Sequence, residues 1–311
     1  MFAIENRADG VRGRREASPV PVLGGFIAAQ AAFAIALTAT PSTVFAQCFP
    51  PTNSNEALLL AHYEVPLNYS TLGMPTVLSP WHVALTGELT GVPAPSASIS
   101  QTSYCYQSKQ EGTHLAPVLP RLRVALGLPA GFGVELSYLP PITIDQAQPN
   151  LVSFAATYAY DIIAPSDKGP SVTIGGRAYG TLGRVVGPVT CPSSSLQQSD
   201  PAAPCYGTNP SADTFYPNAA GVDATIGAAT HGGFGAFFGL GYNWLEPHFR
   251  VGFTSLTGAT DHTLVEVSLQ RASIFGGIGV PIVNGLTAAA EVYSAPSDLT
   301  TWRLSIRYVI P

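Results

Sequence analysis

The last stretch of the chain alternates strictly between apolar and polar side chains, and this pattern restricts the fold more than any other feature. Its even positions carry Trp302, Leu304, Ile306, Tyr308 and Ile310. The odd positions between them include two arginines. A period of two places the two sets on opposite faces of an extended chain. Residues 300–310 are therefore predicted to form a β-strand with one apolar and one polar face.

Similar alternation recurs upstream and predicts ten strands in total. The predicted segments are 80–91, 120–128, 132–143, 150–162, 171–186, 222–244, 247–257, 262–281, 285–295 and 300–310, with a turn expected at 245–246. Segment 222–244 exceeds the roughly 10 residues that cross a bilayer as a tilted strand, so it either extends further or breaks at 231–233. The apolar phase slips within 262–281, which favours a β-bulge near Arg271.

The low charge of the chain narrows the fold class. Only 11% of the residues are charged, against about 25% in a typical soluble domain. After the first 46 residues, no stretch supplies the ~20 consecutive apolar residues of a membrane helix. A closed membrane barrel and a soluble β-sandwich both fit, but glycine opposite the large apolar side chains favours a tight barrel interior over a solvated face. We predict an all-β, closed antiparallel transmembrane β-barrel of about ten strands, with eight or twelve as alternatives.

The N-terminus has the order of a secretory signal. Residues 1–19 contain four arginines, residues 20–37 are mainly apolar, and the small-residue sequence VFA at 44–46 precedes Gln47. This order of basic, apolar and small residues is typical of a signal peptide. A retained membrane anchor is the alternative, although two glycines weaken the apolar run. We predict that residues 1–46 are a cleaved signal peptide.

Four cysteines, Cys48, Cys105, Cys191 and Cys205, follow the predicted cleavage site. An even number in an exported chain favours disulfides, and neither spacing resembles a zinc site. Cys191 and Cys205 bracket a Pro- and Ser-rich stretch that has no core of its own, so a local bond between them is expected. Cys48 and Cys105 then form the second candidate pair.

The predicted strands leave three other regions. Residues 47–79 contain several prolines and are expected to form an irregular N-terminal segment or a plug. The barrel itself is expected over 80–311, with long connections at 92–119 and 187–221. A bond between Cys48 and Cys105 requires that residues 47–79 thread the barrel or that the barrel has the opposite orientation; otherwise the pair does not form.

The predicted inner face carries charges of both signs. Its members are Glu88, Arg121, Arg123, Glu135, Asp161, Arg177, Arg250, Glu266, Glu291, Arg303 and Arg307. The near balance of acids and arginines favours ion pairs across the interior, because the planar guanidinium binds carboxylates in a bidentate manner. A constriction that selects ions is the functional interpretation. A network that fills the barrel is favoured, since about ten strands enclose a narrow interior.

With this alternation, the predicted signal and the closing strand 302–310, the chain resembles bacterial outer-membrane β-barrel proteins of the small, porin-like kind. The last strand resembles their assembly signal, although it ends in Pro311 rather than in an aromatic residue. The resemblance implies a location in the bacterial outer membrane. It also implies contact with outer-membrane lipid and with the barrel-assembly machinery. The implied function is a narrow passive pore, of unknown solute, or a structural surface protein.

Two other function classes were weighed. An outer-membrane barrel enzyme needs a rim site, for which Asp261 and His262 are the best candidates. A ten-stranded outer-membrane protease family has Asp and His one residue apart and a second acidic pair, and this chain has neither. A secreted soluble β-sandwich with a binding role is the other alternative. We expect no catalysis, no cofactor and no metal, and a net charge of −5 without a basic cluster after Arg15 argues against nucleic acid.

Overall fold

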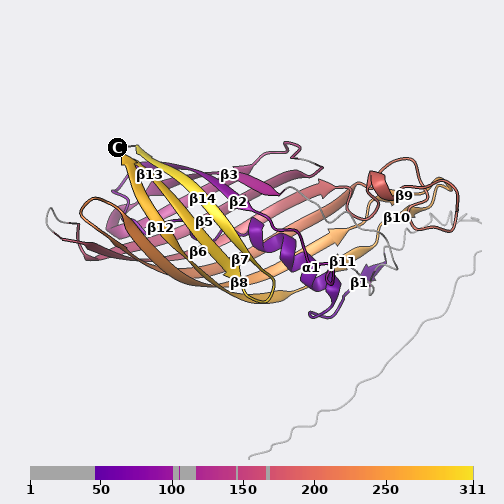
Figure 1. Cartoon of the computed structure of the whole chain (residues 1–311), viewed down its shortest axis with the longest axis horizontal. Helices are drawn as coiled ribbons and strands as arrows, with labels where there is room; N and C mark the ends of the chain where they lie inside the picture. Colours follow the sequence, from indigo (N-terminus) through magenta and orange to yellow (C-terminus); the bar gives the residue numbers. More distant parts are fainter. Residues whose placement is uncertain (1–45, 101–104, 106–116, 145, 166–168, 311) are drawn as a thin grey trace, which may run out of the picture. The chain divides into compact units, whose positions relative to one another are not determined.

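The computed structural model describes residues 46–100, 105, 117–144, 146–165 and 169–310, and within them ten strands close into a barrel (Figure 1). The strands are β2 (Val83–Gly91), β3 (Val118–Gly127), β4 (Phe132–Leu139), β5 (Gln148–Ile163), β6 (Ser171–Gly187), β7 (Asp213–Ala229), β8 (Gly235–Arg250), β12 (Leu269–Val283), β13 (Leu286–Ala295) and β14 (Leu299–Ile310). Each pairs antiparallel with the next, and β14 pairs with β2 to complete the circle. The predicted fold class is confirmed.

Side chains divide between the two faces of the wall according to the period of two. On β14, Trp302 and Ile306 are 47% and 55% exposed, whereas Arg303 is fully buried. Exposed apolar side chains also cover the outer face of β3 and β8, for example Leu122 and Leu240. So many large apolar side chains on one outer surface are typical of a barrel that faces lipid.

Two departures from the ten predicted segments cancel, so the strand number is unchanged. The alternative of a break within 222–244 is confirmed, because a turn at 230–234 divides the segment between β7 and β8, and Gly233 there has a φ of +79° that favours glycine. The predicted turn at 245–246 and the separate strand 247–257 are wrong, because β8 continues to Arg250. Leu245 is fully buried there and keeps the alternation unbroken.

The expected β-bulge near Arg271 is also wrong. β12 pairs with β8 in continuous register from Leu269 to Gly279. Odd positions point inward from Val265, in the short strand β11 (Leu264–Glu266), through Phe275. The apolar residues change from the inner to the outer face along this stretch, and they do so without any change of register.

The connections at the two ends of the barrel differ in length. β3–β4, β5–β6, β7–β8 and β12–β13 are joined by short turns at one end, called here the short-turn end. The opposite, long-loop end carries connections 92–117, 188–212 and 251–268, the last of which contains β11 and the small hairpin of β9 (Phe253–Thr254) and β10 (Thr260–Asp261). The second long connection is shorter than predicted, because β7 begins at Asp213.

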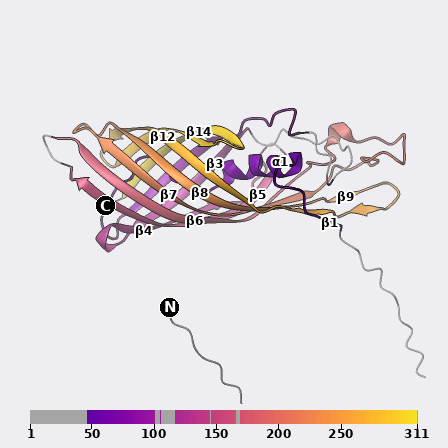
Figure 2. The same cartoon turned by 90° about the horizontal axis from the view of Figure 1, so that it is seen from below.

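The described chain begins at the long-loop end. β1 (Gln47–Cys48) pairs with β11, and it is followed by helix α1 (Asn55–Glu64), which lies at the mouth of the barrel (Figure 2). The 3-10 turn η1 (Val65–Leu67) follows the helix directly. The helix corrects the expectation of an irregular segment. It forms because Ser54 caps its first turn and because the prolines flank it without interrupting it. No helix in the described ranges is long and apolar enough to cross a membrane.

Both predicted disulfides are present. Cys48 bonds to Cys105, and Cys191 bonds to Cys205. The first joins the N-terminal segment to the connection after β2 at the long-loop end, while β2 itself begins at the short-turn end. The chain between them therefore crosses the barrel, which was one of the alternatives left open by the sequence. The predicted signal peptide falls on residues 1–46, of which only Ala46 is described.

Candidate functional site

The inside of the barrel, or lumen, is crossed by residues 68–79, called here the luminal segment. Asn68, Tyr69 and Ser70 have at most 1% of their surface exposed, so the segment fills the lumen at this level. Further along, the segment passes close to inward glycines. A Cβ on Gly175 would lie 2.9 Å from Pro75, and one on Gly227 would lie 2.8 Å from it. Glycine at these wall positions gives the segment its space.

Arg123 joins the wall to the luminal segment through an ion pair. Its Nη2 lies 2.7 Å from Glu88 Oε2 and its Nε donates to the same oxygen, with both side chains almost fully buried. Its Nη1 donates to the backbone oxygen of Ser70 at 3.0 Å. Removal of either partner of such a buried pair is costly, because the charge of the other partner then stays buried without a counter-ion or water to stabilise it.

Two further arginines hold the same part of the segment. Arg121 donates to the backbone oxygens of Leu67 and Asn68 at 2.6 and 3.2 Å. Arg303 donates to the Ser70 hydroxyl and pairs with Glu291 at 3.4 Å. The guanidinium groups thus satisfy backbone carbonyls that no strand pairing serves.

Tyr69 lies among the arginines at the level of closure. Its ring centroid is 4.4 Å from the guanidinium carbon of Arg123, 5.1 Å from that of Arg177 and 5.7 Å from that of Arg121. Arg177 is itself paired with Glu135 at 2.9 Å. The ring is attracted to these cations by its quadrupole and occupies the space between them.

The sequence analysis missed two inward-facing polar residues, Asp223 and Asn243. Asp223 accepts from the backbone N–H of Thr71 at 2.9 Å and also from the Thr71 hydroxyl. Asn243 is hydrogen-bonded to Asn68 and Tyr179. Both lie on odd positions of β7 and β8, opposite the apolar even positions, so the alternation within 222–244 was itself the signal that could have identified them as inward-facing.

The structure places the predicted inner-face charges in three groups. Eight meet the lumen, namely Glu88, Arg121, Arg123, Glu135, Arg177, Glu291, Arg303 and Arg307. Asp161 also lines the lumen, nearer the short-turn end, and accepts from the Thr173 hydroxyl at 2.6 Å. The prediction is wrong for Arg250 and Glu266. Their strand neighbours Phe249 and Val265 are buried, so these apolar residues point inward at the long-loop end and the charged ones point outward.

A cavity of about 390 Å³ with a mixed lining, mostly apolar, opens on the short-turn side of the closure. Thr76, Thr86, Asp161, Thr173 and Arg307 contribute to its lining, and Arg307 donates to the Thr76 hydroxyl at 2.7 Å. The lumen is thus hollow from the short-turn end as far as the middle of the luminal segment, where the buried arginines begin.

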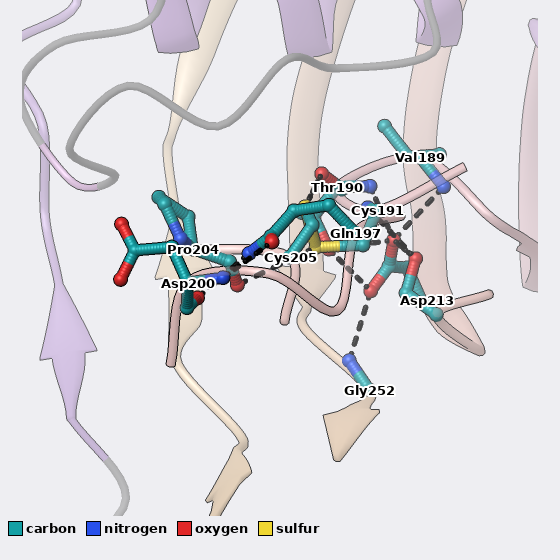
Figure 3. Close-up of a disulfide and its surroundings, with 10 residues drawn as sticks. Val189, Thr190, Cys191, Gln197, Asp200, Pro204, Cys205, Asp213 and Gly252 are labelled. Carbon is teal, nitrogen blue, oxygen red and sulfur yellow. Dashed lines mark hydrogen bonds between the residues drawn. A yellow bond between two sulfur atoms is a disulfide. The ribbon is translucent and has the colours of Figure 1, made fainter. Parts of the chain in front are cut away.

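Asp213 organises the long-loop end beside the Cys191–Cys205 disulfide (Figure 3). Its carboxylate accepts from the backbone N–H groups of Val189, Thr190 and Gly252 at 2.6–2.9 Å. The hydroxyl of Ser211 donates to it at 2.7 Å. One buried carboxylate therefore fixes the start of β7, both ends of connection 188–212 and the chain after β8.

The predicted rim candidates Asp261 and His262 lie near β10, away from the lumen. Asp261 accepts from the backbone and hydroxyl of Thr263 at 2.9 and 2.7 Å. His262 Nδ1 lies 3.4 Å from the Val251 backbone oxygen. Within the described ranges, no group of three or more His, Cys, Asp or Glu side chains is placed to hold a metal ion.

Glu64, the last residue of α1, is expected to make the anchoring of the helix dependent on pH. Burial raises the pKa of its fully enclosed carboxyl well above the usual value, and the neighbouring charges of Glu246 and Asp298 add to this. Stability that is present below the ordinary pKa of glutamate is therefore lost as pH rises through the raised one. Amide hydrogen-exchange protection of α1 should fall on the alkaline side in the native protein and stay constant in Glu64→Gln. Equal pH dependence in both proteins would contradict this role of Glu64.

No protein-family profile matches the chain, and no curated protein matches it. Among solved structures it is similar to a deltaS2 mutant of the TodX monoaromatic hydrocarbon channel, with a TM-score of 0.28 and 13% identity over 74% of this chain and 66% of that chain, just under two thirds. It is also similar to the attachment invasion locus protein Ail of Yersinia pestis (TM-score 0.21, 9% identity, 74% and 97% covered). A mutant porin of Rh. blastica gives a TM-score of 0.19 with 10% identity, over 74% and 99% of the chains. These neighbours are outer-membrane β-barrels.

Proposed function

We propose that this chain is a bacterial outer-membrane barrel that acts as a narrow passive channel, and that its own N-terminal segment closes the lumen. The apolar outer wall supports insertion in lipid, because only a closed sheet satisfies all strand hydrogen bonds there. The two disulfides support an oxidising compartment. The long connections lie at one end and most of the short turns at the other, as in outer-membrane barrels.

The observation that carries the proposal is the position of the closure. Tyr69 and the arginines around it block the middle of the lumen, yet about 390 Å³ remains open on the short-turn side, where Asp161, Arg307 and several hydroxyls are part of the lining. A barrel with a purely structural role gains nothing from such a space, since protein interiors are otherwise close-packed. A channel needs it, because a solute has to leave through a hydrated path.

The contacts that hold the luminal segment also suit a plug that can be displaced from the lumen. The luminal segment is attached mainly by side-chain hydrogen bonds, from Arg121, Arg123 and Arg303. None of these is a pairing between barrel strands, so the segment can be displaced while the sheet stays closed. A structural surface protein is the second candidate, and the completeness of the burial around Tyr69 favours it. The two functions differ in conductance.

We expect Tyr69→Ala to raise single-channel conductance in a planar bilayer. The substitution removes the ring that fills the space between three guanidinium groups, and hydrated ions can then reach the open cavity. The native protein is expected to conduct only in rare openings.

Two variants control for loss of the native fold. Tyr69→Phe keeps the ring, and because the described structure gives the Tyr69 hydroxyl no hydrogen-bond partner, it should conduct like the native protein. Tyr160→Ala makes the same truncation on the outer face, where Tyr160 is exposed, and should also leave conductance unchanged. A folded Tyr69→Ala barrel that conducts no more than the native protein would favour the structural role.

A further inference from the structure

A second cavity, of about 60 Å³, lies on the other side of the closure, at the long-loop end. Its wall is almost wholly apolar and includes Tyr63, Leu67, Leu119, Val185, Phe215 and Phe249. The first two belong to the N-terminal segment and the others to β3, β6, β7 and β8. The cavity therefore lies between the barrel wall and the chain that closes the lumen, and it is open on one side.

Contact with lipid does not explain the apolar wall of this cavity, because the wall belongs to the inner face of the barrel. Leu119 lies on the inner face of β3, on the same side as Arg121 and Arg123, while Leu122 points outward. The inner wall is thus polar around the luminal segment and apolar here. Asp213, the one charged residue in the lining, has its carboxylate oxygens occupied by backbone N–H groups and hydroxyls, so it offers little to a polar ligand.

We propose that this cavity binds the apolar end of a small amphipathic solute, whose polar end stays at the open mouth. The volume equals roughly four to six water-sized spheres, which suits a short alkyl group of about four carbons. An apolar pocket with few polar groups is the usual form of a small-molecule site. Water gains little in such a space, because the lining gives it too few hydrogen-bond partners.

The site also indicates how a solute acts on the closure. Leu67 lines the cavity, and its backbone oxygen accepts a hydrogen bond from Arg121. A ligand that displaces Leu67 therefore strains the hydrogen bond that fixes the start of the luminal segment. This role as a solute-binding site ahead of the closure rests on the proposed channel function, whereas the binding itself does not.

Methyl NMR with 1-hexanol as the probe tests the binding. The full-length mature protein is labelled at Leu and Val methyl groups and embedded in lipid nanodiscs. The Leu67 and Val185 methyl shifts are expected to change saturably with hexanol. The methyl of Leu182, which faces outward, should change only linearly as hexanol enters the lipid.

Matched substitutions on one strand locate the site. Leu119→Trp fills the cavity and should weaken the saturable shift at least tenfold, whereas Leu122→Trp on the outer face should leave it unchanged. Should Leu119→Trp fail to give a folded, heat-modifiable band, Val185→Phe replaces it, with the outward Leu182→Phe as its control and Leu240 as the lipid reference. Linear shifts alone, or native affinity in the filled variant, would overturn the proposal. Saturable binding without conductance in Tyr69→Ala would reject the channel and keep the site, and the reverse result would reject only the site.

Discussion

Replacing Arg123 by methionine should lower the free energy of unfolding by about 3–5 kcal/mol, because it leaves a buried carboxylate without its partner. Arg123 and Glu88 are 2.7 Å apart, with side-chain exposures of 4% and 1%. The same substitution removes the hydrogen bond to the Ser70 backbone. Urea unfolding in lipid vesicles, followed through the heat-modifiable band, measures the loss.

Two variants separate the stranded charge from other causes. The double substitution Arg123→Met with Glu88→Leu removes both charges and should recover most of the stability, since an apolar pair often replaces a buried ion pair at little cost. Arg250→Met truncates an exposed arginine on the outer face and should change stability by no more than about 0.5 kcal/mol. A double variant as unstable as the single one would show that the charge of Glu88 is not responsible.

Asp213→Ala should have the second large effect, confined to the long-loop end. It leaves the backbone N–H groups of Val189, Thr190 and Gly252 without their acceptor. A buried donor left unsatisfied costs about 1–3 kcal/mol, so the three together favour local opening by about 3 kcal/mol or more. Proteolytic cleavage within 188–212 should then rise at least ~100-fold, at 1.4 kcal/mol for each factor of ten.

The matched control for this substitution lies in the same connection. Asp200 is exposed and accepts from the Ala202 N–H at 2.9 Å, so Asp200→Ala should leave the cleavage rate within a few-fold of the native one. Asp213→Asn retains one carbonyl oxygen and should give an intermediate rate. Equal rates for Asp213→Ala and Asp200→Ala would contradict the organising role of Asp213.

The alternation in the sequence was sufficient to predict the barrel, because a wall one residue thick has to turn every second side chain outward. It also identified most of the inward charges. A charged residue such as Arg303, which alternates with apolar residues that point outward, has to point inward. The same rule failed at Arg250 and Glu266. Near the long-loop end, Phe249 and Val265 share one buried cluster with residues of α1, so apolar side chains no longer point outward there.

The course of residues 47–79 needed information that no local pattern contains. The cysteine pairing made threading one of several alternatives, but long-range contacts, such as those of Asn68 with Asn243 and of Thr71 with Asp223, place the segment in the lumen. These partners are more than 150 residues apart in sequence. Met74 and Pro75 lie against inward glycines. A single glycine in the sequence does not indicate which other segment of the chain packs against it.

Labelling of intact cells tests the central claim most directly, namely that this is an outer-membrane barrel crossed by its own N-terminal segment. Thr52 is exposed at the long-loop end and Ser79 is exposed at the short-turn end, so a cysteine is introduced at one position or the other. A membrane-impermeant maleimide should label Thr52→Cys in intact cells and should label Ser79→Cys only after the outer membrane is permeabilised. Labelling of both positions in intact cells, or of Ser79→Cys alone, would contradict the account.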